Sequence, residues 1–153
     1  MKLLIRESIP ADEATIQWVA HAAAPTTPLP EAGRYWDSPR QFQRWTAKWD
    51  GRLIALADYT QAPDSAYEFW VSIYVHPQAQ GRGIGSALYT HLRNALLPFN
   101  PLALKASLHP ERAEAVRFLT ARGYRVESHI HRPTGHVTFV KLFKSTEEKD
   151  YTP

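Results

Sequence analysis

The chain of 153 residues contains no cysteine. This absence excludes disulfide scaffolds, thiolate metal sites and cysteine nucleophiles, and it fits a reducing compartment. The sequence also lacks any run of about 18 apolar residues, which is the length that a membrane span requires. Its amino terminus turns charged at Arg6 after only three consecutive apolar residues. We therefore expect a cytoplasmic protein that does not bind membranes.

Positive charge is in small excess, because the chain has 18 lysines and arginines and 15 aspartates and glutamates, for a net charge of +3. This excess favours anionic partners, but the basic residues are scattered along the chain, whereas nucleic-acid binders cluster them. We therefore expect no nucleic-acid partner. The length and the 44% hydrophobic content are typical of one globular domain. We assign this domain to residues 1–144 and a polar, charged tail to residues 145–153.

The hydrophobic pattern predicts alternating strands and helices. Strands are expected at residues 3–8, 44–48, 53–59, 67–76, 102–108, 124–131 and 136–143. Helices are expected from Pro10, from Ile84 to Leu96 and from Pro110, with a short helix between residues 31 and 42 and a loop at residues 20–30. The strand at 67–76 carries apolar residues on both faces, which predicts a central, buried position in the sheet.

A glycine-rich turn follows this central strand. The strand ends in Val75-His76-Pro77, and Gln80-Gly81-Arg82-Gly83-Ile84-Gly85 leads into the helix. Glycine lets the backbone approach a ligand closely, and the first turn of a helix offers unpaired N–H groups at the positive end of its dipole. The segment therefore predicts a phosphate-binding turn.

Two familiar glycine motifs do not match this turn. A P-loop requires Lys-Ser or Lys-Thr after its last glycine, whereas Gly85 is followed by Ser86-Ala87. The dinucleotide fingerprint requires G-x-G-x-x-G, and the last spacing here is one residue too short. ATP hydrolysis and dinucleotide binding are therefore not expected.

The segment instead resembles the acyl-CoA site of the GNAT (GCN5-related N-acetyltransferase) superfamily, whose signature is Gln/Arg-x-x-Gly-x-Gly/Ala after a central strand. The resemblance implies an α/β acyl-CoA N-acyltransferase-like fold, with a mixed, mostly antiparallel sheet and about four helices. It implies acetyl-CoA as co-substrate, with the pyrophosphate on the N–H groups of residues 81–86 and pantetheine beside the strand end. The implied cofactor-binding residues are Ile73, Tyr74, Val75, Gln80, Gly81, Arg82, Gly83, Ile84, Gly85 and Ser86.

A second family element, an alanine- and aromatic-rich helix that ends in a glycine–aromatic pair, is similar to residues 115–124. Arg112 stands where many members carry asparagine, and Leu119 stands where many carry a tyrosine proposed to protonate the departing thiolate. Tyr124, Tyr74, Ser107 or water could supply the proton instead. These departures leave a non-catalytic acyl-CoA-binding or sensing domain as the alternative to an enzyme.

The expected activity is transfer of an acetyl or other acyl group from acetyl-CoA to an amine of a small molecule or a protein by direct attack. A carboxylate near the thioester could take the proton of the amine. Glu68, at the start of the central strand, is the first candidate for this catalytic base, and a solvent-facing carboxylate at the strand entrance is the alternative role for it. Asp58 is the second, although a solvated or turn-capping role is expected for it. The sequence leaves a homodimer open.

Histidines and tryptophans have ordinary roles in this interpretation. His129, His131 and His136 surround one turn, but no cysteine or carboxylate pair lies near them, so no metal site is expected. Turn packing is expected for His76 and His109. The five tryptophans are expected to pack in or beside the core; they are Trp18, Trp36, Trp45, Trp49 and Trp70.

Overall fold

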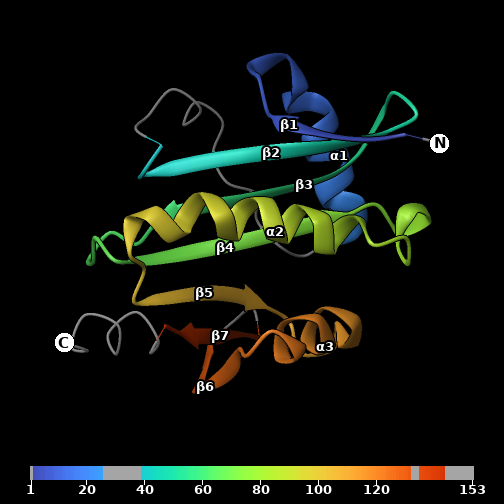
Figure 1. Ribbon diagram of the computed structural model, residues 1–153. Helices are drawn as coiled ribbons and strands as arrows, with labels where there is room; N and C mark the ends of the chain where they lie inside the picture. Colours follow the sequence, from blue (N-terminus) through green and yellow to red (C-terminus); the bar gives the residue numbers. More distant parts are fainter. Residues whose placement is uncertain (1, 26–38, 132–134, 144–153) are drawn as a thin grey trace. The chain divides into compact units, whose positions relative to one another are not determined.

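The computed structural model describes residues 2–25, 39–131 and 135–143, with side chains omitted at 128–131. In chain order the elements are β1 (Leu3–Glu7), α1 (Glu13–Ala23), β2 (Phe42–Trp49), β3 (Arg52–Gln61), β4 (Glu68–Val75), α2 (Ile84–Leu96), β5 (Ala103–Leu108), α3 (Ala113–Ala121), β6 (Arg125–His131) and β7 (His136–Leu142) (Figure 1). Every strand expected from the hydrophobic pattern is present. Among these described residues, no helix is long and apolar enough to cross a membrane.

The seven strands form one mixed sheet in the order β1-β2-β3-β4-β5-β7-β6. Strands β4 and β5 run parallel, whereas the pairs β1–β2, β2–β3, β5–β7 and β6–β7 run antiparallel. The predicted α/β class with a mostly antiparallel sheet is confirmed. All eight residues of β4 are buried or half-buried, as expected for a central strand.

Three expectations about helices need correction. The described residues contain three α-helices rather than about four, and the short helix expected between residues 31 and 42 falls mainly outside them. Residues 20–23 continue α1 instead of forming a loop, because Ala20 is buried in the core. Helix α3 begins at Ala113 rather than at Pro110, since His109 caps an intervening turn by accepting the N–H of Glu111 at Nδ1 (3.2 Å). The expected tail at 145–153 lies outside the described residues.

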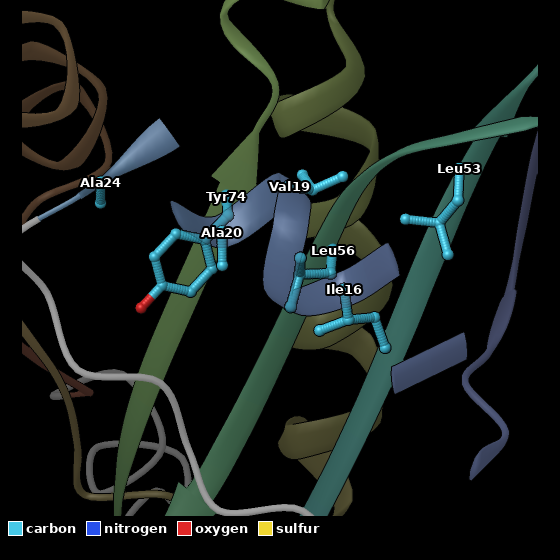
Figure 2. Close-up of a cluster of buried hydrophobic side chains, with 7 residues drawn as sticks. All are labelled: Ile16, Val19, Ala20, Ala24, Leu53, Leu56 and Tyr74. Carbon is cyan, nitrogen blue, oxygen red and sulfur yellow. The ribbon is translucent and has the colours of Figure 1, made fainter. Parts of the chain in front are cut away.

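The chain forms two compact units, which divide β4 between them. The first unit comprises Met1–Thr60 and Ser72–Pro98 and contains β1 to β3, the end of β4, α1 and α2. Within it, α1 and α2 cover opposite faces of the strands (Figure 1). The α1 face buries a cluster of seven residues (Figure 2), namely Ile16, Val19, Ala20, Ala24, Leu53, Leu56 and Tyr74. This packing holds the end of β4, from which the glycine turn departs.

The second unit comprises Gln61–Val71 and Phe99–Pro153 and contains the start of β4, β5, α3, β6 and β7. The parallel register pairs Glu68 with Ala103 and Trp70 with Lys105. Strand β7 lies between β5 and β6, and it pairs antiparallel with both. Phe69, Leu104 and Phe139 are almost completely buried and form part of the core of this unit.

Candidate functional site

The connection from β4 to α2 begins with a capped turn. His76 follows the last residue of β4, and its Nδ1 accepts the N–H of Gln78 (3.1 Å), which starts a single 3-10 turn at Pro77–Ala79. The His76 ring stacks on Trp18 of α1, with centroids 4.7 Å apart and ring planes 25° apart. The turn-packing role expected for His76 is therefore what the structure shows. Trp18 itself is 53% exposed, so only part of it packs.

The glycine turn has the backbone conformation that its sequence requires. Gly81 has φ +81° and Gly83 has φ +78°, a region that residues with a Cβ adopt only at a cost. Gly83 is also the N-cap of α2, and no side chain caps this helix end. A Cβ built on Gly81 or Gly83 would have no heavy atom of the described part of the chain within 4 Å. The turn is therefore an open backbone cradle at the positive end of a 13-residue helix.

This cradle fits a phosphate or pyrophosphate group. The first N–H groups of an α-helix have no partner within the helix, and the free space over the two glycines lets an anion approach them. The exposed side chain of Arg82 lies between the two glycines and adds a positive charge to the turn. The Cζ of Arg82 lies 5.5 Å from the centroid of the Trp49 ring. The sequence did not reveal this partner of Arg82.

Gln80, the first residue of the glycine motif, closes the turn back onto the strand. Its Nε2 donates a hydrogen bond to the backbone O of Val75 (3.2 Å). The side chains of Ile73 and Val75 are half-buried, whereas that of Tyr74 is buried in the α1 cluster. In Figure 2 the ring of Tyr74 lies beside Ala20 with its hydroxyl directed away from the aliphatic residues. Tyr74 is therefore part of the core.

Glu68 makes an ion pair that the sequence did not predict. The Nζ of Lys105 lies 2.9 Å from Oε1 of Glu68, and both side chains are partly exposed. The same Nζ lies 5.8 Å from the centroid of the Trp70 ring. The hydrogen bond to Glu68 is the main cause that raises the pKa of Lys105, so this lysine stays protonated. Only the parallel register of β4 and β5 brings these residues together.

Asp58 is neither solvated nor a turn cap, so that expectation was wrong. Its carboxylate is buried and accepts a hydrogen bond from Nε of Arg44 (2.9 Å), and Nη1 of Arg44 lies 3.6 Å from Glu13. Burial raises the pKa of Asp58, and the charge of Arg44 opposes this shift. A buried arginine requires such partners, because an unpaired charge in the core is costly. Asp58 therefore has a structural role that the sequence did not indicate.

The raised pKa of Asp58 predicts how stability depends on pH. A carboxyl group that binds its proton more tightly in the folded state makes folding less favourable as pH rises above its unfolded pKa, about 3.9. We expect the free energy of unfolding of the parent, relative to that of Asp58→Asn, to fall between pH 4 and pH 7. Urea denaturation at several pH values measures this difference, with Asp64→Asn in an exposed turn as the control for loss of a carboxylate. A rise of the parent relative to Asp58→Asn would show that attraction to Arg44 outweighs burial.

The other residues considered for proton transfer lie in different settings. Leu119 packs in the core of the second unit, and Tyr124 is also buried there, whereas Ser107 on β5 is exposed.

The rings of His109 and His136 meet edge to face at 5.9 Å. Within the described residues, no group of three potential metal ligands occurs. The side chains of His129 and His131 lie outside the described part.

The sequence matches the profile of the acetyltransferase (GNAT) family over residues 12–124. No curated protein sequence matches the chain.

Several solved structures share the fold. YncA from Salmonella typhimurium, a putative acetyltransferase solved with acetyl-CoA, superposes with a TM-score of 0.71 at 18% identity, over 93% of this chain and 94% of that chain. The PaiA N-acetyltransferase of Thermoplasma acidophilum, solved with coenzyme A, gives 0.74 at 16% identity, over 94% and 100%. The ribosomal-protein-alanine N-acetyltransferase of Brucella melitensis gives 0.74 at 20% identity, over 92% and 99%.

Proposed function

Because the chain belongs to the GNAT acetyltransferase family, we propose that it transfers an acetyl group from acetyl-CoA to an amine of a small molecule or a protein. The observation that carries this proposal is the open turn at Gly81 and Gly83, placed between the central strand and the first turn of α2. Two proteins of the same fold were solved with acetyl-CoA or coenzyme A, which supports the same ligand here. The cysteine-free composition favours the reducing cytoplasm for this activity.

In this proposal the backbone of residues 81–86 binds the pyrophosphate, and Arg82 adds charge beside it. Gln80 contributes by holding the turn against the end of β4 through its bond to Val75. Pantetheine lies along residues 73–75 and pairs with backbone groups, as an added strand would. The Tyr74 side chain takes no part in this pairing, since it packs against α1.

The proposed reaction has no covalent enzyme intermediate, in keeping with the absence of cysteine. The amine nitrogen attacks the thioester carbonyl, the C–S bond breaks, and the thiolate of coenzyme A departs. Glu68 accepts the proton that the amine loses, directly or through water. Backbone N–H near Val75 stabilises the negative charge on the carbonyl oxygen. Leu119 has no proton to give, but a thiol of pKa about 8.5 leaves readily as the thiolate.

The second candidate is a domain that binds or senses acyl-CoA without catalysis. Leu119 and Arg112 favour it, because both depart from the family pattern, and Leu119 replaces the tyrosine proposed to protonate the thiolate. The ion pair of Glu68 with Lys105 also favours it, since a carboxylate that already holds an ammonium group is a poorer acceptor for another proton. Both candidate functions bind acyl-CoA at the glycine turn, and they differ only in whether the acyl group is transferred to an amine.

Calorimetric titration with acetyl-CoA, followed by an assay of free thiol release with a panel of amines, separates these functions. We expect binding, and thiol release with at least one amine of the panel. Acetyl-CoA at about 100 times its dissociation constant should stabilise the fold by about 2.7 kcal/mol, which a thermal melt detects. Binding without thiol release would support the sensing domain. The absence of both binding and thermal shift would contradict both candidates.

A further inference from the structure

Arg82 lies in the glycine turn with an aromatic ring beneath it. Its Cζ is 5.5 Å from the ring centroid of Trp49, the last residue of β2. This distance is within the range of about 6 Å over which a cation is attracted to an aromatic face. Trp49 is far from the turn in sequence, and it is half-buried, whereas Arg82 is exposed. An exposed arginine on a short turn would otherwise sample many rotamers.

The position of Trp49 is itself well determined. In the antiparallel registers of the first unit, Trp49 lies opposite Leu3 of β1 and opposite Arg52 of β3. Two neighbouring strands therefore hold the backbone that carries this ring. On the other side of the contact, the positive φ angles of Gly81 and Gly83 define the backbone on either side of Arg82. Both partners thus start from fixed backbones, so the contact restricts where the guanidinium can lie.

An arginine that packs against an aromatic ring can still donate hydrogen bonds. The N–H donors of a guanidinium lie in its plane, so a group that meets an aromatic ring through its face can still donate to phosphate oxygens at its edge. We propose that Trp49 is a positioning residue, which holds the Arg82 guanidinium beside the glycine turn for an anionic phosphate group of coenzyme A. This inference rests on the proposed function, because it assumes that coenzyme A binds at residues 81–86.

The test is calorimetric titration of the full chain with coenzyme A. Arg82→Gln should weaken binding by about 10-fold, because it removes a charge-assisted contact with phosphate. Trp49→Leu should weaken binding by about two- to five-fold, the range expected for one exposed cation–π contact. Trp49→Phe keeps an aromatic face and should restore most of the affinity. Arg93→Gln removes the same charge from an exposed position in the last turn of α2, and it should leave the affinity unchanged.

A double-mutant cycle makes the test specific. If Trp49 acts through Arg82, then Trp49→Leu should have no further effect in the Arg82→Gln background. Additive losses, or equal affinities of Trp49→Leu and the parent, would overturn the inference. Failure of the parent itself to bind coenzyme A would instead contradict the proposed function. A loss caused by misfolding is recognised by the melting temperature of each variant and by the absence of rescue in Trp49→Phe.

Repeating the titrations with dephospho-CoA, which lacks the 3′-phosphate, shows whether Arg82 contacts the pyrophosphate or the 3′-phosphate of coenzyme A. If Arg82 serves the pyrophosphate, the losses for Arg82→Gln and Trp49→Leu should be the same with both ligands. If it serves the 3′-phosphate, both losses should disappear with dephospho-CoA. Either outcome supports the positioning role of Trp49, provided that the two variants respond together. A response of Trp49→Leu that does not follow that of Arg82→Gln would contradict it.

Discussion

Gly83→Val is expected to weaken acetyl-CoA binding by at least about 100-fold, or about 2.7 kcal/mol. Gly83 has φ +78°, which a β-branched residue adopts only with strain. No heavy atom of the described residues lies within 4 Å of where a Cβ would stand, and in the proposed complex this space admits the phosphate. The branched side chain would therefore block the N–H groups at the start of α2. Calorimetric titration measures the loss.

Gly123→Val is the matched control for the backbone strain. Gly123 follows α3 in the second unit and has φ +92°, with Cε of Lys141 3.8 Å from an added Cβ. This variant should lose stability in a thermal melt but retain the affinity of the parent for acetyl-CoA. If Gly83→Val folds and binds acetyl-CoA as tightly as the parent, the glycine turn is not the phosphate site. Gly83→Ala gives a milder variant should the valine variant fail to fold.

Glu68→Gln is expected to lower kcat by about 10² to 10⁴, the usual contribution of a general base in position. Glutamine keeps the size of the side chain and removes its basicity. Affinity for acetyl-CoA should remain nearly unchanged, because Glu68 is not part of the glycine turn. Steady-state kinetics with the best amine of the panel, together with calorimetric titration, separates these two quantities.

The contact between Glu68 and Lys105 requires a second variant. Glu68→Gln also weakens the ion pair with Lys105, so a loss of turnover could arise from disturbed structure. Lys105→Met breaks the same ion pair and leaves the carboxylate in place, and it should therefore lose far less turnover. Equal losses in the two variants would assign the effect to the ion pair. Full turnover of Glu68→Gln with an unaltered pH profile would show that the base lies elsewhere or that the amine arrives neutral through water.

Features that depend on neighbours along the chain could be predicted from the sequence. The strands followed from alternation, and α2 followed from its helical spacing between the glycine turn and Pro98, because both patterns are set by local backbone geometry. The positive φ angles of Gly81 and Gly83 belong to the same class, since only glycine adopts them without strain. The conformation of the glycine turn was predictable because it depends on the backbone of one continuous segment.

Capping was less predictable, although it is also local. Pro110 is a good first residue for a helix, but the side chain of His109 accepts the N–H of Glu111 and stabilises a turn instead. Helix α3 therefore starts later, at Ala113. A proline indicates only that a helix can begin, whereas hydrogen bonds to the preceding side chain decide where it does begin.

The tertiary structure alone decided which charged and aromatic groups meet. Lys105 reaches Glu68 because β4 and β5 pair in parallel, and no pattern in the sequence states that register. Asp58 becomes a buried partner of Arg44 because the two residues face each other in the β2–β3 register. These pairings depend on strand register and burial, which are set by the packing of the whole sheet and not by the residues next to each group in the chain.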